Sequence, residues 1–298
     1  MPTIDEFNQL RESWFLKLRA ENKSKGSIAT YGKGLTAYSK WCQRRGDDPH
    51  LTGDHVKAFL AEFLGEERGG KPTTAANYLT AIRLFVAWCV AEEELPKDEI
   101  AGLAYPKVGK HYRPPLSVEE LAAMTATCDN SFMGRRDTAL LRFMVDTGGR
   151  SNEITGLLLS NLWVPKGRVL FKGKGDKERL AAFTPETALA LDRYLRMRRR
   201  HALAATTDRV WLPAHGRTFG YDGLWEMVKS RAALAGVEDV HPHRFRRTFA
   251  DNWLSEGGSV DGLMAIAGWE NMEMIKVYAG ARANVRALEE HQRIFGAQ

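Results

Sequence analysis

The sequence predicts a mainly α-helical protein with one small β-hairpin or sheet, an α+β fold that is divided into two domains. Apolar residues recur at helical spacing along most of the chain, whereas residues 167–183 have the pattern of two short strands around a Gly-Lys-Gly-Asp turn. A length of 298 residues favours two domains. The segment 96–115, which contains four prolines and no helical pattern, is expected to be the linker between them.

Residues 1–95 are expected to form a domain of four helices. Thr3 is a suitable N-cap for the first helix, and the pair Gly69-Gly70 marks the end of the third. The fourth segment is the most apolar. No apolar run is expected to reach the roughly 20 residues of a membrane span, so no membrane partner is expected. The four expected segments are 3–22, 27–46, 52–70 and 73–95.

Residues 116–298 are expected to form the second domain. Ser117 and Glu120 have the spacing of a capping box, and Thr184 followed by Pro185 is a strong signal for a helix start. The expected helices of this domain are 135–150, 184–203, 221–235, 243–254, 259–267 and 271–279. A final amphipathic stretch carries an apolar stripe made of Val285, Leu288, Ile294 and Phe295.

The composition is that of an ordinary globular protein, with 44% hydrophobic and 27% charged residues. The N-terminus lacks the cationic stretch followed by an apolar one that defines a signal peptide. Cys42, Cys89 and Cys128 are widely spaced and form no C-x-x-C pair. This pattern favours free thiols in a reducing cytoplasm over disulfides or a zinc site.

The net charge of +6 indicates a nucleic-acid partner only weakly, but its distribution is more informative. Between Lys17 and Arg45 eight basic residues stand against one acid, Glu21, which would give a basic face able to follow a phosphate backbone. A solvated lysine-rich helix face would produce the same pattern, so charge alone leaves both interpretations open. The candidate DNA-binding residues are Lys23, Lys25, Lys33, Lys40, Arg44, Arg45, Lys71 and Arg247.

The stretch VHPHRFRRTFADNWL contains two overlapping H-x-x-R patterns, His241 with Arg244 and His243 with Arg246. In a helix that starts at the proline, three aromatic residues at every fourth position form a buried stripe, and His243 and Arg246 lie off it. His241 precedes the helix, so the second pattern is favoured. A guanidinium holds phosphate oxygens bidentately and an imidazole exchanges a proton near neutral pH. The pair therefore indicates phosphate chemistry.

Three further motifs support the same chemistry. TGGRSNE places Arg150 at a joint between two helices, GKGDKER places Lys174 at the tip of the predicted hairpin, and AGWENMEMIKVYAG places Tyr278 nine residues after Trp269. In order, spacing and residue type these motifs resemble those of the tyrosine recombinases, the family of phage integrases and Xer-type recombinases. The resemblance covers nearly the whole chain, because the first domain resembles the family's core-DNA-binding domain and the second its catalytic domain.

The resemblance implies a role for each matching residue. Arg150 and Arg246 would clamp the scissile phosphate, and Tyr278 would attack it to form a 3′-phosphotyrosine. Lys174 would be the general acid that protonates the leaving 5′-hydroxyl, and His243 would be a proton partner. The bond energy is kept in the ester, so resealing needs no ATP, and no metal or other cofactor is expected.

The sequence departs from the family's pattern at three positions. Gly149 stands where a larger apolar residue is usual, and Arg247 stands where His is common. Trp269 fills a position that His or Trp occupies, and there it removes one titratable group but keeps an indole N–H donor.

The resemblance also implies partners. The protein is expected to act as a homotetramer on two recombination sites in double-stranded DNA, in the nucleoid of a bacterial host's cytoplasm, with integration of viral DNA among its roles. The terminal apolar stripe would dock on a neighbouring subunit, and the alternative is a helix folded back on its own domain. The first helix begins close to Met1, so no arm-binding domain is expected. Short core sites should then suffice, and the reaction should run in both directions.

Two other functions use parts of the same pattern. A type IB topoisomerase shares the Arg, Lys, His and Tyr chemistry, but the four-helix domain and the length favour a recombinase, and strand exchange between two duplexes would distinguish them. A DNA-binding protein that has lost catalysis is the second alternative. The intact set of catalytic residue types argues against it, and a covalent adduct with a suicide substrate would exclude it.

Overall fold

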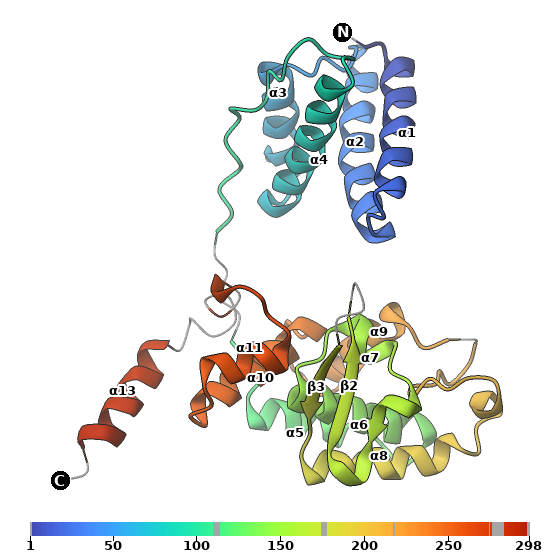
Figure 1. Ribbon diagram of the computed structural model, residues 1–298, viewed down its shortest axis with the longest axis vertical. Helices are drawn as coiled ribbons and strands as arrows, with labels where there is room; N and C mark the ends of the chain where they lie inside the picture. Colours follow the sequence, from blue (N-terminus) through green and yellow to red (C-terminus); the bar gives the residue numbers. More distant parts are fainter. Residues whose placement is uncertain are drawn as a thin grey trace. The chain divides into compact units, whose positions relative to one another are not determined.

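The chain forms two compact units, residues 1–111 and residues 112–298 (Figure 1). The first unit is helical, and the second combines helices with one small sheet. The predicted mainly α, α+β fold class is therefore confirmed. The computed structural model describes residues 2–109, 114–173, 178–216, 218–273, 275 and 283–296.

The first unit contains the four predicted helices: α1 (Ile4–Ala20), α2 (Lys25–Arg45), α3 (Gly53–Leu64) and α4 (Pro72–Ala91). They lie side by side, with α2 packed along α4 (Figure 1). The predicted cap at Thr3 is present as a full capping box with Glu6, which satisfies backbone donors that the first turn leaves free.

The sequence predicts that no segment is long and apolar enough to span a membrane, but helix α4 meets both criteria. It has 20 residues and a mean hydropathy of 1.3 over its most apolar window. Its apolar character has a structural cause, because Leu79, Ile82 and Phe85 are fully buried in the core of the first unit. The same face packs along α2, as the central helix of a packed bundle would.

The first part of the predicted linker is packed against the first unit. Ile100 and Leu103 are buried and belong to the same core as the four helices. The guanidinium of Arg83 on α4 donates hydrogen bonds to the carbonyl oxygens of Ala101 and Leu103. Apolar residues between prolines thus order a segment without regular secondary structure.

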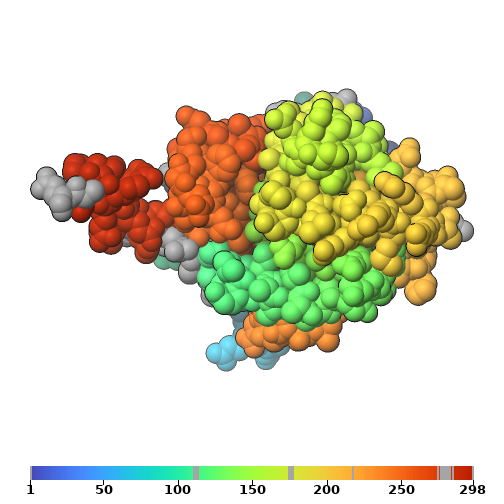
Figure 2. All heavy atoms as spheres, turned by 90° about the horizontal axis from the view of Figure 1, so that it is seen from below, coloured from blue at the N-terminus to red at the C-terminus, as the bar shows by residue number. Residues whose placement is uncertain are grey.

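The second unit is built around α6, which packs against α8 and α10. The predicted capping box of Ser117 and Glu120 and the predicted cap at Thr184 are both present. Figure 2 shows α5 and α6 (green) beside α8 (yellow), with α10 and α11 (orange) and then α13 (red) toward one edge. Most of the helix predicted at 271–279 lies outside the described residues. The helices are α5 (Val118–Ala126), α6 (Phe132–Thr147), α7 (Ser151–Thr155), α8 (Pro185–Arg198), α9 (Tyr221–Leu234), α10 (Pro242–Ser255), α11 (Val260–Ala267) and α13 (Ala283–Phe295).

The sheet of the second unit has three antiparallel strands in the order β1-β2-β3. The predicted hairpin is present as β2 (Arg168–Lys172) and β3 (Glu178–Ala182), with Phe171 opposite Arg179. Strand β1 (Leu162–Trp163) was not predicted, because two residues are too few to show the alternation of a strand.

Candidate active site

Arg150 occupies the joint between α6 and α7. Gly148 ends α6 in the left-handed conformation, with φ of +54°, and Arg150 then precedes the first turn of α7. Both its backbone N–H and its guanidinium donate to the carboxylate of Glu153, at 2.9 and 2.7 Å. The other terminal nitrogen of the guanidinium donates to the carbonyl oxygen of Gly268 at 2.7 Å, and 45% of the side chain is exposed. Arg150 is therefore oriented and still open to solvent.

The glycine at position 149 has a packing reason. A Cβ atom there would lie 2.7 Å from Cγ1 of Ile154 and 3.0 Å from the ring of Phe171. The first contact is closer than packed carbon atoms allow, and the second is tighter than most. The departure from the family's pattern at this position thus reflects the close approach of α7 and β2.

Arg246 is the buried arginine of the site. Its guanidinium donates hydrogen bonds to the carbonyl oxygens of Gly148 and Ala267, and it stacks over the ring of Trp269 at 5.2 Å. Only 2% of Arg246 is exposed, although the sequence places it off the apolar stripe of α10. Carbonyl groups from two other segments make this burial possible, because a buried guanidinium needs acceptors.

The structure also separates the two H-x-x-R patterns. Arg244 is buried and is held by the carbonyl oxygens of Pro114 and Glu238 and by the carboxylate of Glu120. It ties the start of α10 to α5 and to the chain that enters the second unit. His241 is the N-cap residue of α10. The first pattern is structural, which leaves His243 and Arg246 as the pair in the site.

His243 is close enough to three arginines to be affected by their charges. His243 stands three residues before Arg246 on α10 and is exposed, yet neighbouring groups remove part of its ring from water. This partial desolvation, together with the positive charges of Arg246, Arg150 and Arg247, lowers the pKa of His243 below its ordinary value. The environment therefore favours the neutral imidazole.

Sequence reasoning missed Arg179, which lies beside this cluster on β3. Its guanidinium donates to the carboxylate of Glu153 at 2.6 Å and to the carbonyl oxygen of Ile266. Burial alone would raise the pKa of Glu153, but hydrogen bonds and charge from Arg179 and Arg150 outweigh it, and the pKa lies below the usual range. Glu153 therefore stays ionised between two arginines and orients both of them.

Four of the six predicted catalytic residues, Arg150, His243, Arg246 and Trp269, come together at the end of α11. The other two, Lys174 and Tyr278, lie outside the described residues. Trp269 is buried in a small core between α10 and α11. Within the described part of the chain no group of three or more His, Cys, Asp or Glu side chains is placed to hold a metal ion.

The basic residues predicted to bind DNA in the first unit are all exposed. At 100° per residue, Lys33, Lys40 and Arg44 fall within about 40° of arc on α2 and form a single basic stripe. Arg45 lies off this stripe and is paired with Asp47 at 3.1 Å and with Glu62 at 3.5 Å. Its charge is therefore partly neutralised within the unit.

Comparison with known proteins identifies both units. Residues 115–284 match the phage integrase family, and residues 12–93 match the phage integrase N-terminal SAM-like domain. The chain is 29% identical over 278 residues to the tyrosine recombinase XerD of Proteus mirabilis, with 91% of this chain and 88% of that protein covered. It is 27% identical over 299 residues to XerD of Pseudomonas putida, with 98% of each chain covered.

Solved structures share the fold. The XerH recombinase in a post-cleavage complex with a palindromic difH substrate has a TM-score of 0.72 and 19% identity, with 97% of this chain and 84% of that one covered. The Tn1549 transposon integrase in complex with a circular intermediate DNA has a TM-score of 0.73 and 14% identity, with 96% and 99% covered. The chain thus belongs to the phage integrase family and is a tyrosine recombinase, an enzyme that cuts and rejoins DNA at specific sites.

Proposed function

We propose that Arg150, His243, Arg246 and Trp269 form the phosphate-binding part of the recombinase active site. The observation that carries this proposal is that Arg150, the residue before α7, and Arg246, on α10, donate to successive carbonyl groups, those of Gly268 and Ala267. One turn thereby orients both guanidinium groups. Each has further N–H donors, which suit the non-bridging oxygens of a phosphodiester.

In the proposed reaction, the hydroxyl oxygen of Tyr278 attacks the scissile phosphorus and the bond from phosphorus to the 5′-oxygen breaks. His243, whose environment favours the neutral ring, takes the proton of the tyrosine hydroxyl. Lys174 gives a proton to the leaving 5′-oxygen. The product is a 3′-phosphotyrosine, which the 5′-hydroxyl of another strand attacks to release Tyr278 and restore the phosphodiester.

Arg150 and Arg246 are proposed to stabilise the negative charge of the transition state. Negative charge grows on the non-bridging oxygens as the new bond forms, and donors that are already oriented stabilise it without reorganisation. Each such donor contributes about 3–4 kcal/mol to transition-state stabilisation, or roughly a hundredfold to a thousandfold in rate. Trp269, whose ring covers the guanidinium of Arg246, keeps this charge out of bulk water.

We further propose that the substrate is double-stranded DNA carrying two recombination sites, in the cytoplasm of a bacterial host. The basic stripe of Lys33, Lys40 and Arg44 supports a contact with the phosphate backbone. The structures of the XerH recombinase bound to its difH substrate are consistent with this partner.

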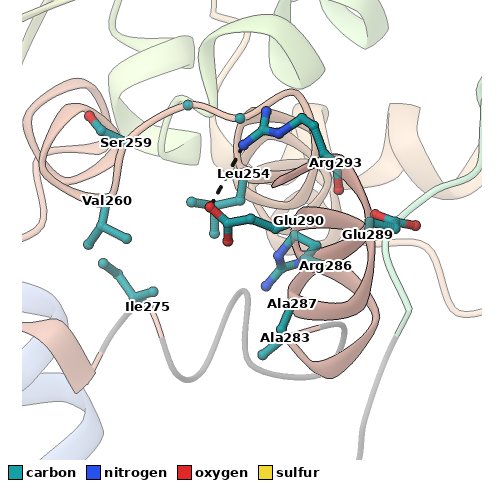
Figure 3. Close-up of a pocket in the computed structure, with 13 residues that line it drawn as sticks. Leu254, Ser259, Val260, Ile275, Ala283, Arg286, Ala287, Glu289, Glu290 and Arg293 are labelled. Carbon is teal, nitrogen blue, oxygen red and sulfur yellow. Dashed lines mark ion pairs between the residues drawn. The ribbon is translucent and has the colours of Figure 1, made fainter. Parts of the chain in front are cut away.

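The proposed assembly is a homotetramer in which α13 docks on a neighbouring subunit. Helix α13 contacts its own unit through an ion pair of 2.6 Å between Arg286 and Asp251. A cavity of about 590 Å³ lies between α13, the end of α10 and Ile275 (Figure 3). The apolar side chains of α13 remain exposed, by 67% at Leu288 and 68% at Phe295. A contact held by an ion pair leaves this apolar stripe available to a second copy.

The covalent step is tested with Tyr278→Phe, because only the attacking oxygen is lost. A suicide substrate with a nick near the cleavage point traps the wild-type protein as a covalent adduct, and the variant should bind the same DNA without forming it. Tyr221→Phe is the matched control, since Tyr221 is an exposed tyrosine that begins α9. An adduct that persists in Tyr278→Phe, or one that is lost in Tyr221→Phe, contradicts the assignment.

The assembly is tested separately by deleting the residues after Ala283. The shortened protein should bind one half-site normally but fail to bring two sites together, measured by native gel mobility and by the yield of recombinant product. Leu16→Ser on α1 is the control, because Leu16 is another exposed apolar residue, at 62% exposure. Normal recombination by the shortened protein would contradict a role for α13 between subunits.

A further inference from the structure

Three arginines meet at the C-terminal end of α11. The carbonyl oxygen of Ile266 accepts from Arg179, that of Ala267 from Arg246, and that of Gly268 from Arg150. The last carbonyl groups of a helix have no partner within the helix and carry a partial negative charge. The end of α11 is therefore a natural place for three guanidinium groups to converge, and each takes one of three successive carbonyls.

Like Arg150 and Arg246, Arg179 donates from both terminal nitrogens of its guanidinium to groups of the protein. Its side chain is 8% exposed, whereas that of Arg150 is 45% exposed. One terminal nitrogen donates to Ile266 and the other to Glu153, so both ends of its guanidinium are committed within the protein. Unlike Arg150 and Arg246, Arg179 stands at no position of the recombinase motifs, and its side chain is held between Glu153 and Ile266. We therefore expect Arg179 to contribute through the residues that it holds.

Those residues belong to both sides of the active site. Through Glu153, which also accepts from the backbone and guanidinium of Arg150, Arg179 fixes the joint that carries the first clamp arginine. Through Ile266 it fixes the end of α11, whose next carbonyl accepts from Arg246. One planar group thus sets the distance between α7 and α11.

Arg179 also relates this arrangement to the hairpin. It stands on β3 directly opposite Phe171 on β2, and its guanidinium lies over that ring at 4.5 Å. The cation–π contact and the strand pairing fix the side chain relative to the sheet. The hairpin whose strands it joins leads to Lys174, the proposed general acid.

We propose that Arg179 is a positioning residue that aligns the clamp arginines with the hairpin of the general acid, through Glu153 and the carbonyl group of Ile266. This inference rests on the proposed roles of Arg150 and Lys174. It predicts a defect in the chemical step, because a small displacement of oriented donors weakens transition-state stabilisation more than it weakens DNA binding.

The test compares Arg179→Lys and Arg179→Gln with the wild-type protein on the suicide substrate, at saturating DNA. Lysine keeps the charge beside Glu153 but offers no planar fork to hold Glu153 and Ile266 at once. We expect both variants to form the adduct at least tenfold more slowly, with affinity for the half-site within about threefold of wild type. The rate constant is read separately from the fraction of protein that reacts.

A purely structural role would lower the reacting fraction and the unfolding temperature but leave the rate constant of the folded protein unchanged, and that result would overturn the proposal. Arg179→Lys guards against a variant that fails to fold, since it preserves the ion pair. Arg168→Gln is the matched control, because Arg168 is an exposed arginine on the neighbouring strand β2. It should react at the wild-type rate.

The proposed active site and the positioning role can fail independently. An adduct that depends on Tyr278 in the wild-type protein supports the active site whatever Arg179 does. With that result in hand, a wild-type rate constant in both Arg179 variants rejects the positioning role alone.

Discussion

Arg150 and Gly268 are joined by a hydrogen bond of 2.7 Å from the guanidinium to the carbonyl oxygen, across 118 positions of sequence. Gly268 holds this carbonyl in place because it ends α11 in the left-handed conformation, with φ of +64°. The position has no room for a side chain, since a Cβ atom would lie 2.8 Å from Cδ of Arg179 and 3.5 Å from Nη1 of Arg150. The arginine side chains that this turn orients therefore require a glycine at position 268.

Gly268→Ala should therefore slow adduct formation at least tenfold, because the added methyl group displaces Arg179, which holds Glu153 and, through it, Arg150. It should also cost about 1–2 kcal/mol of stability from the left-handed backbone. Gly236→Ala is the control, since Gly236 has a φ of +66° and open space around its Cα. The control should lose similar stability in urea unfolding and keep the cleavage rate. Equal cleavage rates in the two variants would refute the steric argument.

Substitutions of Arg244 and Arg246, the arginines of the two overlapping patterns, should have different effects: the first on stability and the second on the cleavage rate. Arg244→Gln removes a buried tie to Glu120 and to backbone carbonyls, so the second unit should lose about 2 kcal/mol or more of stability. The variant that remains folded should cleave at a normal rate. Arg246→Gln should instead lower the rate of adduct formation by roughly a hundredfold or more. Urea unfolding and single-turnover cleavage are measured on both variants. If Arg244→Gln slowed cleavage while Arg246→Gln mainly lowered stability, the two assignments would be wrong.

The pH dependence of cleavage should report on His243. Partial desolvation and the charges of Arg246, Arg150 and Arg247 lower its pKa, so the neutral ring persists to more acidic pH than in a free histidine. A step that uses the neutral ring loses rate only as pH falls through this lowered pKa. Arg247→Gln removes one positive charge, which should raise the pKa and move the acidic limb to higher pH. Single-turnover rates between about pH 5 and 8 measure the shift. An unmoved limb, or one displaced toward acid, contradicts the assignment.

The basic stripe of α2 should appear in the salt dependence of DNA binding. Each phosphate contact contributes roughly 0.9 to the slope of log affinity against log salt concentration. Replacing Lys33, Lys40 and Arg44 together with glutamine should lower the slope by about 2–3 if all three contact the backbone. Arg45→Gln should change it less, because Arg45 is already paired with Asp47 and Glu62. Equal effects of the triple variant and of Arg45→Gln would show that the stripe is an ordinary solvated face.

Local signals made much of this fold predictable from sequence. The capping boxes of Thr3 and Ser117 and the Thr184-Pro185 start depend on residues only a few positions apart, and all three are present. The choice of His243 with Arg246 over His241 with Arg244 rested on helix periodicity, which places side chains on faces. The same reasoning could not foresee that Arg246 is buried, because its acceptors come from Gly148 and Ala267 in other segments.

The role of Arg179 could not be predicted from the sequence. The pattern of β2 and β3 predicts a hairpin, but strand alternation says nothing of what covers each face. The partners of Arg179, Glu153 and Ile266, are 26 and 87 positions away. Strand β1 was missed for a different reason, since it is two residues long. In both cases the missing information is tertiary.

The three carbonyl groups at the end of α11 also affect the order in which the parts of the protein fold during synthesis. They join segments separated by 118, 87 and 21 positions, so the clamp is complete only after the chain has been synthesised past residue 268. Domains generally fold as units, the N-terminal one first, and pairings between distant segments form late because closing long loops costs entropy. The helical unit at the N-terminus can fold while the clamp arginines still lack their acceptors. A ribosome-bound or truncated chain that ends before α11 would then be able to hold DNA without being able to break it.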